Sequence, residues 1–123
     1  MERAAAKQLV DYLASRAGDM VRAVAFYTGD DYEILYIKDE IRAKYTEAEI
    51  ERVADLLRAE PRRSRVESTF EMGEFRCSLL AFGDGIVMHF PQGGGTGTLV
   101  TLEVDAARQF SQFAAECAGR IYD

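Results

Sequence analysis

Lysine is scarce in this chain, and acidic residues outnumber basic ones. The sequence holds 21 Asp and Glu against 15 Lys and Arg, a net charge of −6, and its only lysines are Lys7, Lys38 and Lys44. Such a surface is typical of cytosolic proteins adapted to high salt, because dissolved ions screen the repulsion between like charges. Binding to nucleic acid is disfavoured, since it depends on counterion release and weakens as salt rises. We expect a salt-adapted cytoplasmic protein without a nucleic-acid partner.

Cysteine and histidine are too few for the common metal and disulfide frameworks. Cys77 and Cys117 belong to no CxxC or Cys/His group, and His89 is the only histidine. This pattern predicts neither a disulfide framework nor a zinc site. We expect two reduced cysteines in the core, no metal and no cofactor.

Long apolar runs are also absent. Residues 1–17 carry charges throughout, unlike a signal peptide or a membrane span, so we expect the chain to stay inside the cell and away from membranes. A composition of 48% hydrophobic and 29% charged residues is typical of a globular protein. At 123 residues the chain is long enough for one core. We expect residues 1–123 to form a single α+β domain.

Two segments in the first half have the apolar spacing of amphipathic helices. Residues 6–17 form the first, and Gly18 is a typical helix stop. Residues 46–59 form the second, where Thr46 and Glu49 are spaced to make a capping box. Both helices should present one apolar face to a sheet.

A third helix is expected near the C-terminus. It should begin after Asp105, which is a favourable N-cap residue. The apolar positions of this helix are Phe110, Phe113, Ala114, Cys117 and Ile121. This stripe also predicts packing against the sheet.

The segments 20–27 and 32–38 are predicted to be strands joined by a tight turn at residues 28–31. The first of these strands is apolar on both faces apart from Arg22. A strand of that kind is typical of the centre of a sheet that is covered from two sides.

Residues 65–82 predict a second hairpin. With Gly73 and Glu74 at its turn, Met72 lies opposite Phe75. This register gathers apolar residues on one face and favourable polar pairs on the other. The first strand of the hairpin has a polar outer face, so we expect it at the edge of the sheet.

Two further strands, 86–90 and 98–104, complete an antiparallel meander. The predicted fold class is α+β, a single antiparallel sheet of five or six strands in the order α-β-β-α-β-β-β-β-α. The first strand should lie beside the last. The first and third helices should cover one face and the second helix the other.

This order of elements resembles the roadblock and profilin-like sandwiches. The resemblance is one of fold, and it implies a dimeric scaffold, a GTPase partner or a small-ligand sensor. The segment from Asp31 to Tyr45, which begins Asp-Tyr-Glu-Ile-Leu-Tyr-Ile, and the segment from Phe82 to Pro91 resemble a family of uncharacterised small acidic proteins from halophilic archaea. That resemblance implies a cytosolic, salt-adapted origin and supplies no functional residues.

The run Gly93–Gly97 is rich in glycine, whose backbone amides can cradle phosphate. A P-loop would carry a lysine and open a helix, whereas this run has no lysine and leads into a strand. We favour a hairpin tip and keep a binding loop as the alternative.

His89 is the obvious candidate for a general base, and Cys77 for a nucleophile. A three-residue loop at Gly83–Gly85 would place His89 opposite Leu79 and diagonal to Cys77. The surrounding residues are apolar, and no carboxylate is in position to orient the ring. We favour a structural, hydrogen-bonded histidine, with a ligand- or redox-sensing pair and a hydrolytic pair as alternatives.

Positive charge gathers around Pro61 at Arg58, Arg62, Arg63 and Arg65. Such a group could contact a phosphate, a nucleic acid or an acidic partner. No aromatic residues are interleaved with these arginines. A solvated connection that also protects an edge strand is the preferred interpretation.

The first hairpin carries three tyrosines, Tyr27, Tyr32 and Tyr36. Tyrosine suits protein interfaces because it is large and has a polar tip. Core packing is the favoured interpretation of these side chains, and a dimer or partner surface is the alternative.

From these patterns we expect a non-enzymatic regulatory or scaffold domain that acts through protein contacts. Its partner should be a second copy, in a homodimer, or another protein. The alternative is a sensor that binds a small-molecule ligand between the sheet and a helix, near Cys77, Leu79 and His89.

Overall fold

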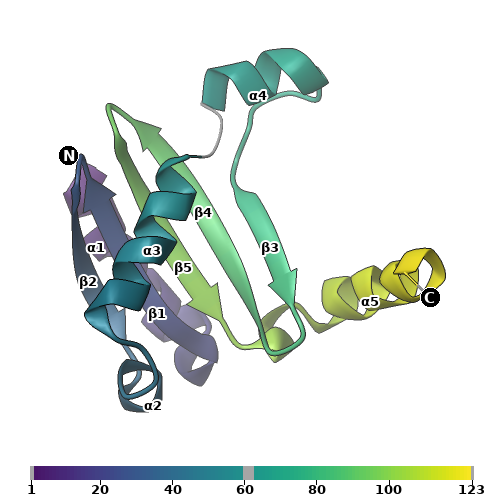
Figure 1. Cartoon of the computed structure of the whole chain (residues 1–123), viewed down its shortest axis with the longest axis horizontal. Coiled ribbons are helices and arrows are strands. Elements are labelled where there is room, and N and C mark those ends of the chain that lie inside the picture. The colour runs from purple at the N-terminus through teal and green to yellow at the C-terminus, as the bar shows by residue number, and fades with distance from the viewer. Residues whose placement is uncertain (1, 60–62, 123) are drawn as a thin grey trace.

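The computed structural model describes residues 2–59 and 63–122 (Figure 1). The described part of the chain contains five strands, five α-helices and two 3₁₀ helices. Along the sequence these elements are α1 (Glu2–Arg16), η1 (Gly18–Met20), β1 (Val21–Thr28), β2 (Asp31–Ile37), α2 (Asp39–Arg42), α3 (Glu47–Arg58), α4 (Arg63–Phe70), β3 (Ser78–Phe82), β4 (Gly85–Gly93), β5 (Thr96–Leu102), η2 (Val104–Ala107) and α5 (Arg108–Tyr122).

The strands form one open antiparallel sheet in the order β2-β1-β5-β4-β3. This confirms the predicted α+β fold with a single antiparallel sheet. The prediction that the first strand lies beside the last is also confirmed, because β1 pairs with β5 and places Val24 opposite Val100. Both of these side chains are fully buried.

One helix covers each face of the sheet (Figure 1). On one face Leu13 of α1 packs against Val24 and Val100. On the other face α3 buries Ala54 and Leu57. Because successive residues of a strand point to opposite faces, β1 supplies both layers of the core.

The start of α3 follows the sequence closely. The Thr46 hydroxyl accepts a hydrogen bond from the Glu49 amide at 3.2 Å, and the Glu49 carboxylate accepts from the Thr46 amide at 3.1 Å. This is the predicted capping box. The helix ends at Arg58, close to the predicted end at residue 59.

The predicted hairpin at residues 65–82 is wrong in its first half. Residues 63–70 form the helix α4 instead of a strand, and the chain then runs without regular structure to β3 at residue 78. The meander therefore has three strands, β3, β4 and β5. Its edge strand is β3, and the other edge of the sheet is β2.

Local contacts explain why a helix forms at this point. The Arg63 guanidinium pairs with the Glu67 carboxylate one turn later. Val66 and Phe70 are four residues apart, so they fit one side of a helix as well as the alternation of a strand. Glu71 adopts the left-handed conformation, with φ of 52°, and ends the helix.

The position predicted for the third helix is also wrong. α5 runs away from the sheet, beyond the β3–β4 turn (Figure 1). All fifteen residues of α5 are described, and none of them is buried. An apolar stripe predicts that a helix face will be covered, but it does not identify the surface that covers it.

The glycine run forms the turn between β4 and β5. Gly93 pairs with Thr96, which leaves Gly94 and Gly95 as a two-residue turn. Both turn residues have positive φ, which glycine adopts without strain. The Gly29 amide donates to the Gly95 carbonyl at 3.2 Å and ties this turn to the β1–β2 turn. The interpretation as a hairpin tip is confirmed.

Candidate functional site

A buried tyrosine and the only histidine meet on the α3 face of the sheet. The Tyr27 hydroxyl of β1 and His89 Nε2 of β4 are 2.8 Å apart. Their ring centroids are 5.8 Å apart and the rings are tilted by 33°. His89 is 1% exposed. It is a buried, hydrogen-bonded histidine, which is the interpretation that the sequence favoured.

A glycine in the intervening strand makes this contact possible. Gly97 of β5 lies opposite Tyr27 on one side and Pro91 on the other. A Cβ atom at Gly97 would overlap the Tyr27 ring and hydroxyl. Glycine inside a strand often marks such a close approach. The sequence analysis missed the role of Gly97, although that signal was present.

Arg58 covers the other side of the tyrosine. Its guanidinium lies over the Tyr27 ring, 5.3 Å from the centroid, within the range of a cation–π interaction. The same guanidinium donates to the Asp31 carbonyl at 2.9 Å and to the Asp55 carboxylate at 2.8 Å. Arg58 therefore joins the end of α3 to the first hairpin.

The predicted Cys/His arrangement is not formed. The β3–β4 turn has two residues instead of three, so His89 lies opposite Ser78 and not Leu79. A shift of one residue moves Leu79 to the opposite face of the sheet. Burial also raises the pKa of the Cys77 thiol, which keeps the thiol in its protonated, less nucleophilic form.

The surroundings of the Tyr27–His89 contact leave little space. The gap between α3 and the sheet, lined by Ala25, Tyr32 and Leu57 among others, has a volume of about 30 Å³, roughly one water molecule. Within residues 2–59 and 63–122, no group of three or more His, Cys, Asp or Glu side chains could hold a metal ion.

The predicted arginine group is divided between elements. Arg62 lies outside the described residues. Arg58 is directed toward Tyr27, as above, while Arg63 and Arg65 are exposed on α4. Arg63 pairs with Glu74 at 2.6 Å as well as with Glu67. The arginines that the structure describes therefore do not form one continuous cationic surface.

The three tyrosines of the first hairpin have different environments. Tyr27 is buried and Tyr32, its cross-strand partner, is half-buried beneath α3. Tyr36 is exposed on the edge strand β2. Core packing therefore accounts for the first two, and Tyr36 alone is available to a partner.

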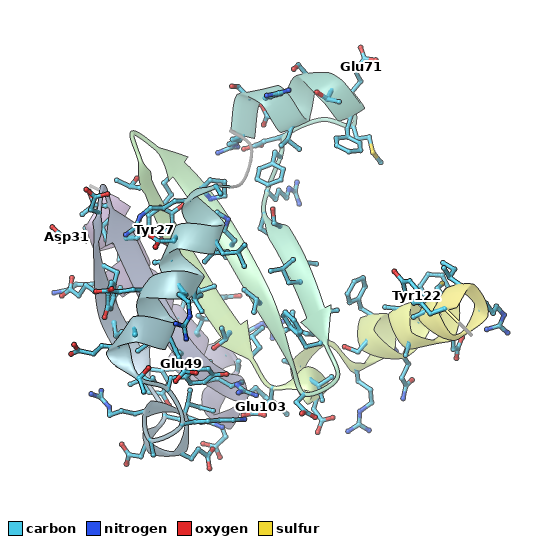
Figure 2. The ribbon with its side chains drawn as sticks, viewed as in Figure 1. Tyr27, Asp31, Glu49, Glu71, Glu103 and Tyr122 are labelled. Atoms are coloured by element: carbon cyan, nitrogen blue, oxygen red, sulfur yellow. The ribbon has the colours of Figure 1, made fainter. Side chains whose placement is uncertain are left out.

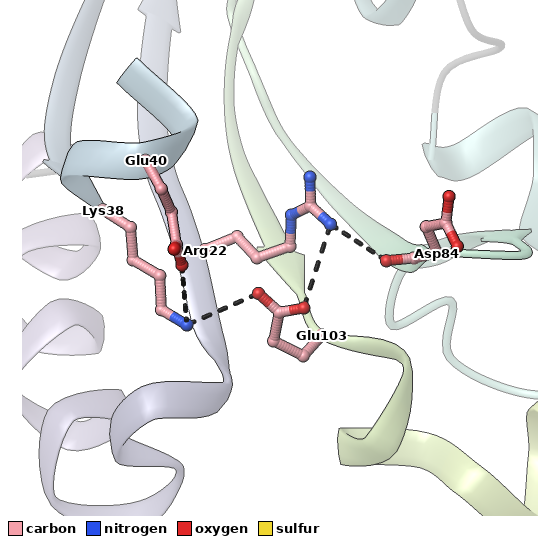
Figure 3. Close-up of polar contacts among 5 residues, drawn as sticks. All are labelled: Arg22, Lys38, Glu40, Asp84 and Glu103. Atoms are coloured by element: carbon pink, nitrogen blue, oxygen red, sulfur yellow. Dashed lines mark hydrogen bonds and ion pairs between the residues drawn. The ribbon is translucent and has the colours of Figure 1, made fainter. Parts of the chain in front are cut away.

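A network of charged side chains lies at the end of the sheet away from the Tyr27–His89 contact (Figure 3). Glu103, just after β5, lies 3.4 Å from the Lys38 ammonium and 3.9 Å from the Arg22 guanidinium. Arg22 also donates to the Asp84 carbonyl at 2.9 Å, and Lys38 lies 3.8 Å from Glu40. These contacts join four separate segments of the chain, so we assign the network a structural role.

Helix α5 carries four large apolar or aromatic side chains that are exposed. Phe113 is 66% exposed and Ile121 is 73% exposed, while Phe110 and Tyr122 are also on the surface. Figure 2 shows the side chains of this helix, including Tyr122, extending from a ribbon that stands apart from α1 and α3. Sequence reasoning assigned this stripe to the core, so its availability to a partner was missed.

Cys117 belongs to the same exposed stripe. The structure has two free cysteines, with Cys77 half-buried and Cys117 exposed. The prediction that both lie in the core is therefore wrong for Cys117. The prediction for Cys117 fails for the same reason as the prediction for α5: the stripe faces outward instead of toward the sheet.

The fold and these contacts define an α+β protein with one open antiparallel sheet. Among the described residues, no helix combines the length and the apolar character that a membrane span requires. Residues 7–122 match the model of a family described as a domain of unknown function, DUF7522, and the chain belongs to this family. A comparison with curated proteins found no match.

Proposed function

We propose that this chain is a non-enzymatic regulatory or scaffold domain that acts through protein contacts and forms a homodimer. The observation that carries the proposal is the exposed apolar stripe of α5. Helices of about 12–15 residues are marginal when isolated in water, and most helical stability in proteins comes from packing an amphipathic face. α5 has 15 residues, so its stripe needs a surface to pack against.

The chemistry around the histidine supports a role other than catalysis. His89 is buried beneath α3 and hydrogen-bonded to Tyr27, so a substrate would have to displace core side chains to reach it. The raised pKa of Cys77 disfavours the thiolate that a nucleophilic cysteine needs. A sensor with a pocket near Cys77, Leu79 and His89 has less support, because Leu79 lies on the opposite face of the sheet from His89.

The mass of the chain in solution tests this proposal. One chain has a mass of 13.8 kDa, and we expect light scattering in molar KCl to give twice that value. A single-chain mass at every protein concentration would contradict the homodimer.

We also propose that the acidic, lysine-poor surface is an adaptation to high salt, as in proteins of halophilic archaea. The net charge of −6 produces self-repulsion that dissolved ions screen. The expected result is a thermal unfolding temperature that rises as KCl increases from the millimolar to the molar range. A temperature that stays constant or falls would contradict the adaptation.

A further inference from the structure

A cleft separates α5 from the outer end of the sheet. Its volume is about 420 Å³, and its sheet side is formed by Ala81, Phe82 and Gly83 around the β3–β4 turn. The helix side is formed mainly by small side chains, among them Ala115 and Ala118. The cleft is therefore a hollow with a largely apolar wall, open at the surface.

The same helix carries the large side chains that could fill such a hollow. With 100° of rotation per residue, Phe110, Phe113 and Ile121 lie on the side of α5 next to the row of small residues. These three side chains are exposed. Each copy thus has a projecting apolar stripe and an apolar cleft beside it. The stripe of one copy can therefore complement the cleft of another.

The direction of α5 keeps its large side chains away from its own sheet. The chain leaves β5 at Glu103. The Glu103 amide donates to the Met20 carbonyl at 2.7 Å, and the Glu103 carboxylate forms ion pairs with Lys38 and Arg22. η2 follows at once, with the Ala106 amide donating to the Glu103 carbonyl at 3.0 Å. Residues 104–109 contain neither glycine nor proline. These contacts hold the start of η2 at the end of the sheet, and α5 follows η2 without a break.

We propose that α5 of each copy inserts its large apolar side chains into the cleft of a second copy. This inference rests on the proposed homodimer and specifies the surface that forms it. Because each copy supplies one stripe and one cleft, a twofold axis closes the pair and leaves neither surface free. Buried aromatic side chains cover about 150–250 Å² each, so Phe110 and Phe113 of both copies account for at most about 600–1,000 Å². Ile121 and the cleft walls, which are covered in turn, bring the total toward the roughly 1,200 Å² of the smallest stable interfaces.

Disulfide trapping between two differently labelled chains tests this contact. The first chain keeps Cys117 and carries Cys77→Ser. The second carries Cys77→Ser, Cys117→Ser and Ala81→Cys, so each chain has a single thiol and any bond between them is intermolecular. Gln112→Cys, at an exposed position of the cleft, replaces Ala81→Cys in a second pair. Ser15→Cys, exposed on α1, replaces it in the control.

After mixing and mild oxidation, we expect a covalent heterodimer for the Ala81→Cys and Gln112→Cys chains, at least tenfold more abundant than for Ser15→Cys. A dimer of unchanged mass that forms no such bond at either cleft position would overturn the inference and leave the homodimer standing. A single-chain mass before oxidation would overturn both. Far-UV circular dichroism of each variant confirms that the chains compared are folded.

Discussion

The Tyr27 hydroxyl reaches His89 Nε2 at 2.8 Å across the backbone of β5. Two strands that do not pair with each other are thereby joined by side chains beneath α3. The contact depends on a glycine at position 97, on the register of three strands and on the burial of both rings. It connects the stability of the sheet to the α3 layer of the core.

Removal of the tyrosine hydroxyl should destabilise the fold. Tyr27→Phe keeps the ring and removes the hydrogen bond to His89, so we expect the free energy of unfolding to fall by about 1–3 kcal/mol. Urea denaturation measures this change. Tyr32→Phe, in the cross-strand partner of Tyr27, is the matched control and should change stability by less than half as much. Equal effects of the two variants would show that the Tyr27–His89 bond contributes nothing specific.

A methyl group at Gly97 should interfere with the tyrosine ring. Gly97→Ala places its Cβ atom where the Tyr27 ring and hydroxyl lie, and overpacking of this kind costs about 1–3 kcal/mol. Gly83→Ala is the control, because nothing lies within 4 Å of the added atom there. In a Tyr27→Leu background, the cost of Gly97→Ala should fall. A cost that is unchanged in this double-mutant cycle would place the strain elsewhere.

The Glu103 carboxylate should contribute more to the free energy of unfolding than an exposed carboxylate does. Glu103→Ala removes the partner of Lys38 and Arg22, whose side chains are 17% and 14% exposed. We expect a loss of about 1–2 kcal/mol, between the values for surface and buried pairs. Asp105→Ala breaks an exposed pair with Arg108 and should cost at most about 0.5 kcal/mol. Chemical denaturation at low and high KCl measures the free energy of unfolding of both variants. A smaller loss for Glu103→Ala than for Asp105→Ala would contradict the structural role assigned to the network.

The α3 capping box should make stability depend on acid pH. The backbone and side chain of Thr46 donate to the Glu49 carboxylate and lower its pKa below the ordinary value of 4.5. Since the folded-state pKa is the lower one, the stabilisation is present above pH 4.5 and is lost as pH falls through the folded-state value. Thr46→Ala should therefore flatten this part of the stability–pH curve. A difference between the wild type and Thr46→Ala that does not shrink below pH 4.5 would contradict this assignment.

Local sequence signals predicted the features that depend on neighbouring residues. Thr46 and Glu49 form their capping box because both groups lie within one turn. The apolar character of both faces of β1 correctly predicted a central strand beside β5. Features that depend on distant contacts were harder to predict. Val66 and Phe70 fit both a helix and a strand, and only the structure shows the helix.

The candidate sites show the same division. The burial of His89 in a hydrogen bond was anticipated, but its partner Tyr27 was not, because the contact crosses β5 and depends on the register of three strands and on Gly97. The stripe of α5 was identified as apolar from its spacing, yet its exposure follows from the direction that η2 imposes. Spacing within one helix carries no information about that direction.

The mass of a stripe variant in solution tests the central claim most directly. Phe113→Glu places a charge on the exposed apolar surface of α5, and the loss of about 1.5–3 kcal/mol at each of two contacts would weaken the dimer about a hundredfold or more. Tyr12→Glu, which makes the same kind of change at an exposed aromatic residue of α1, is the control. In light scattering, we predict the dimer mass for the wild type and Tyr12→Glu, and the single-chain mass of 13.8 kDa for Phe113→Glu. A Phe113→Glu chain that remains a dimer at the wild-type concentration would contradict the account.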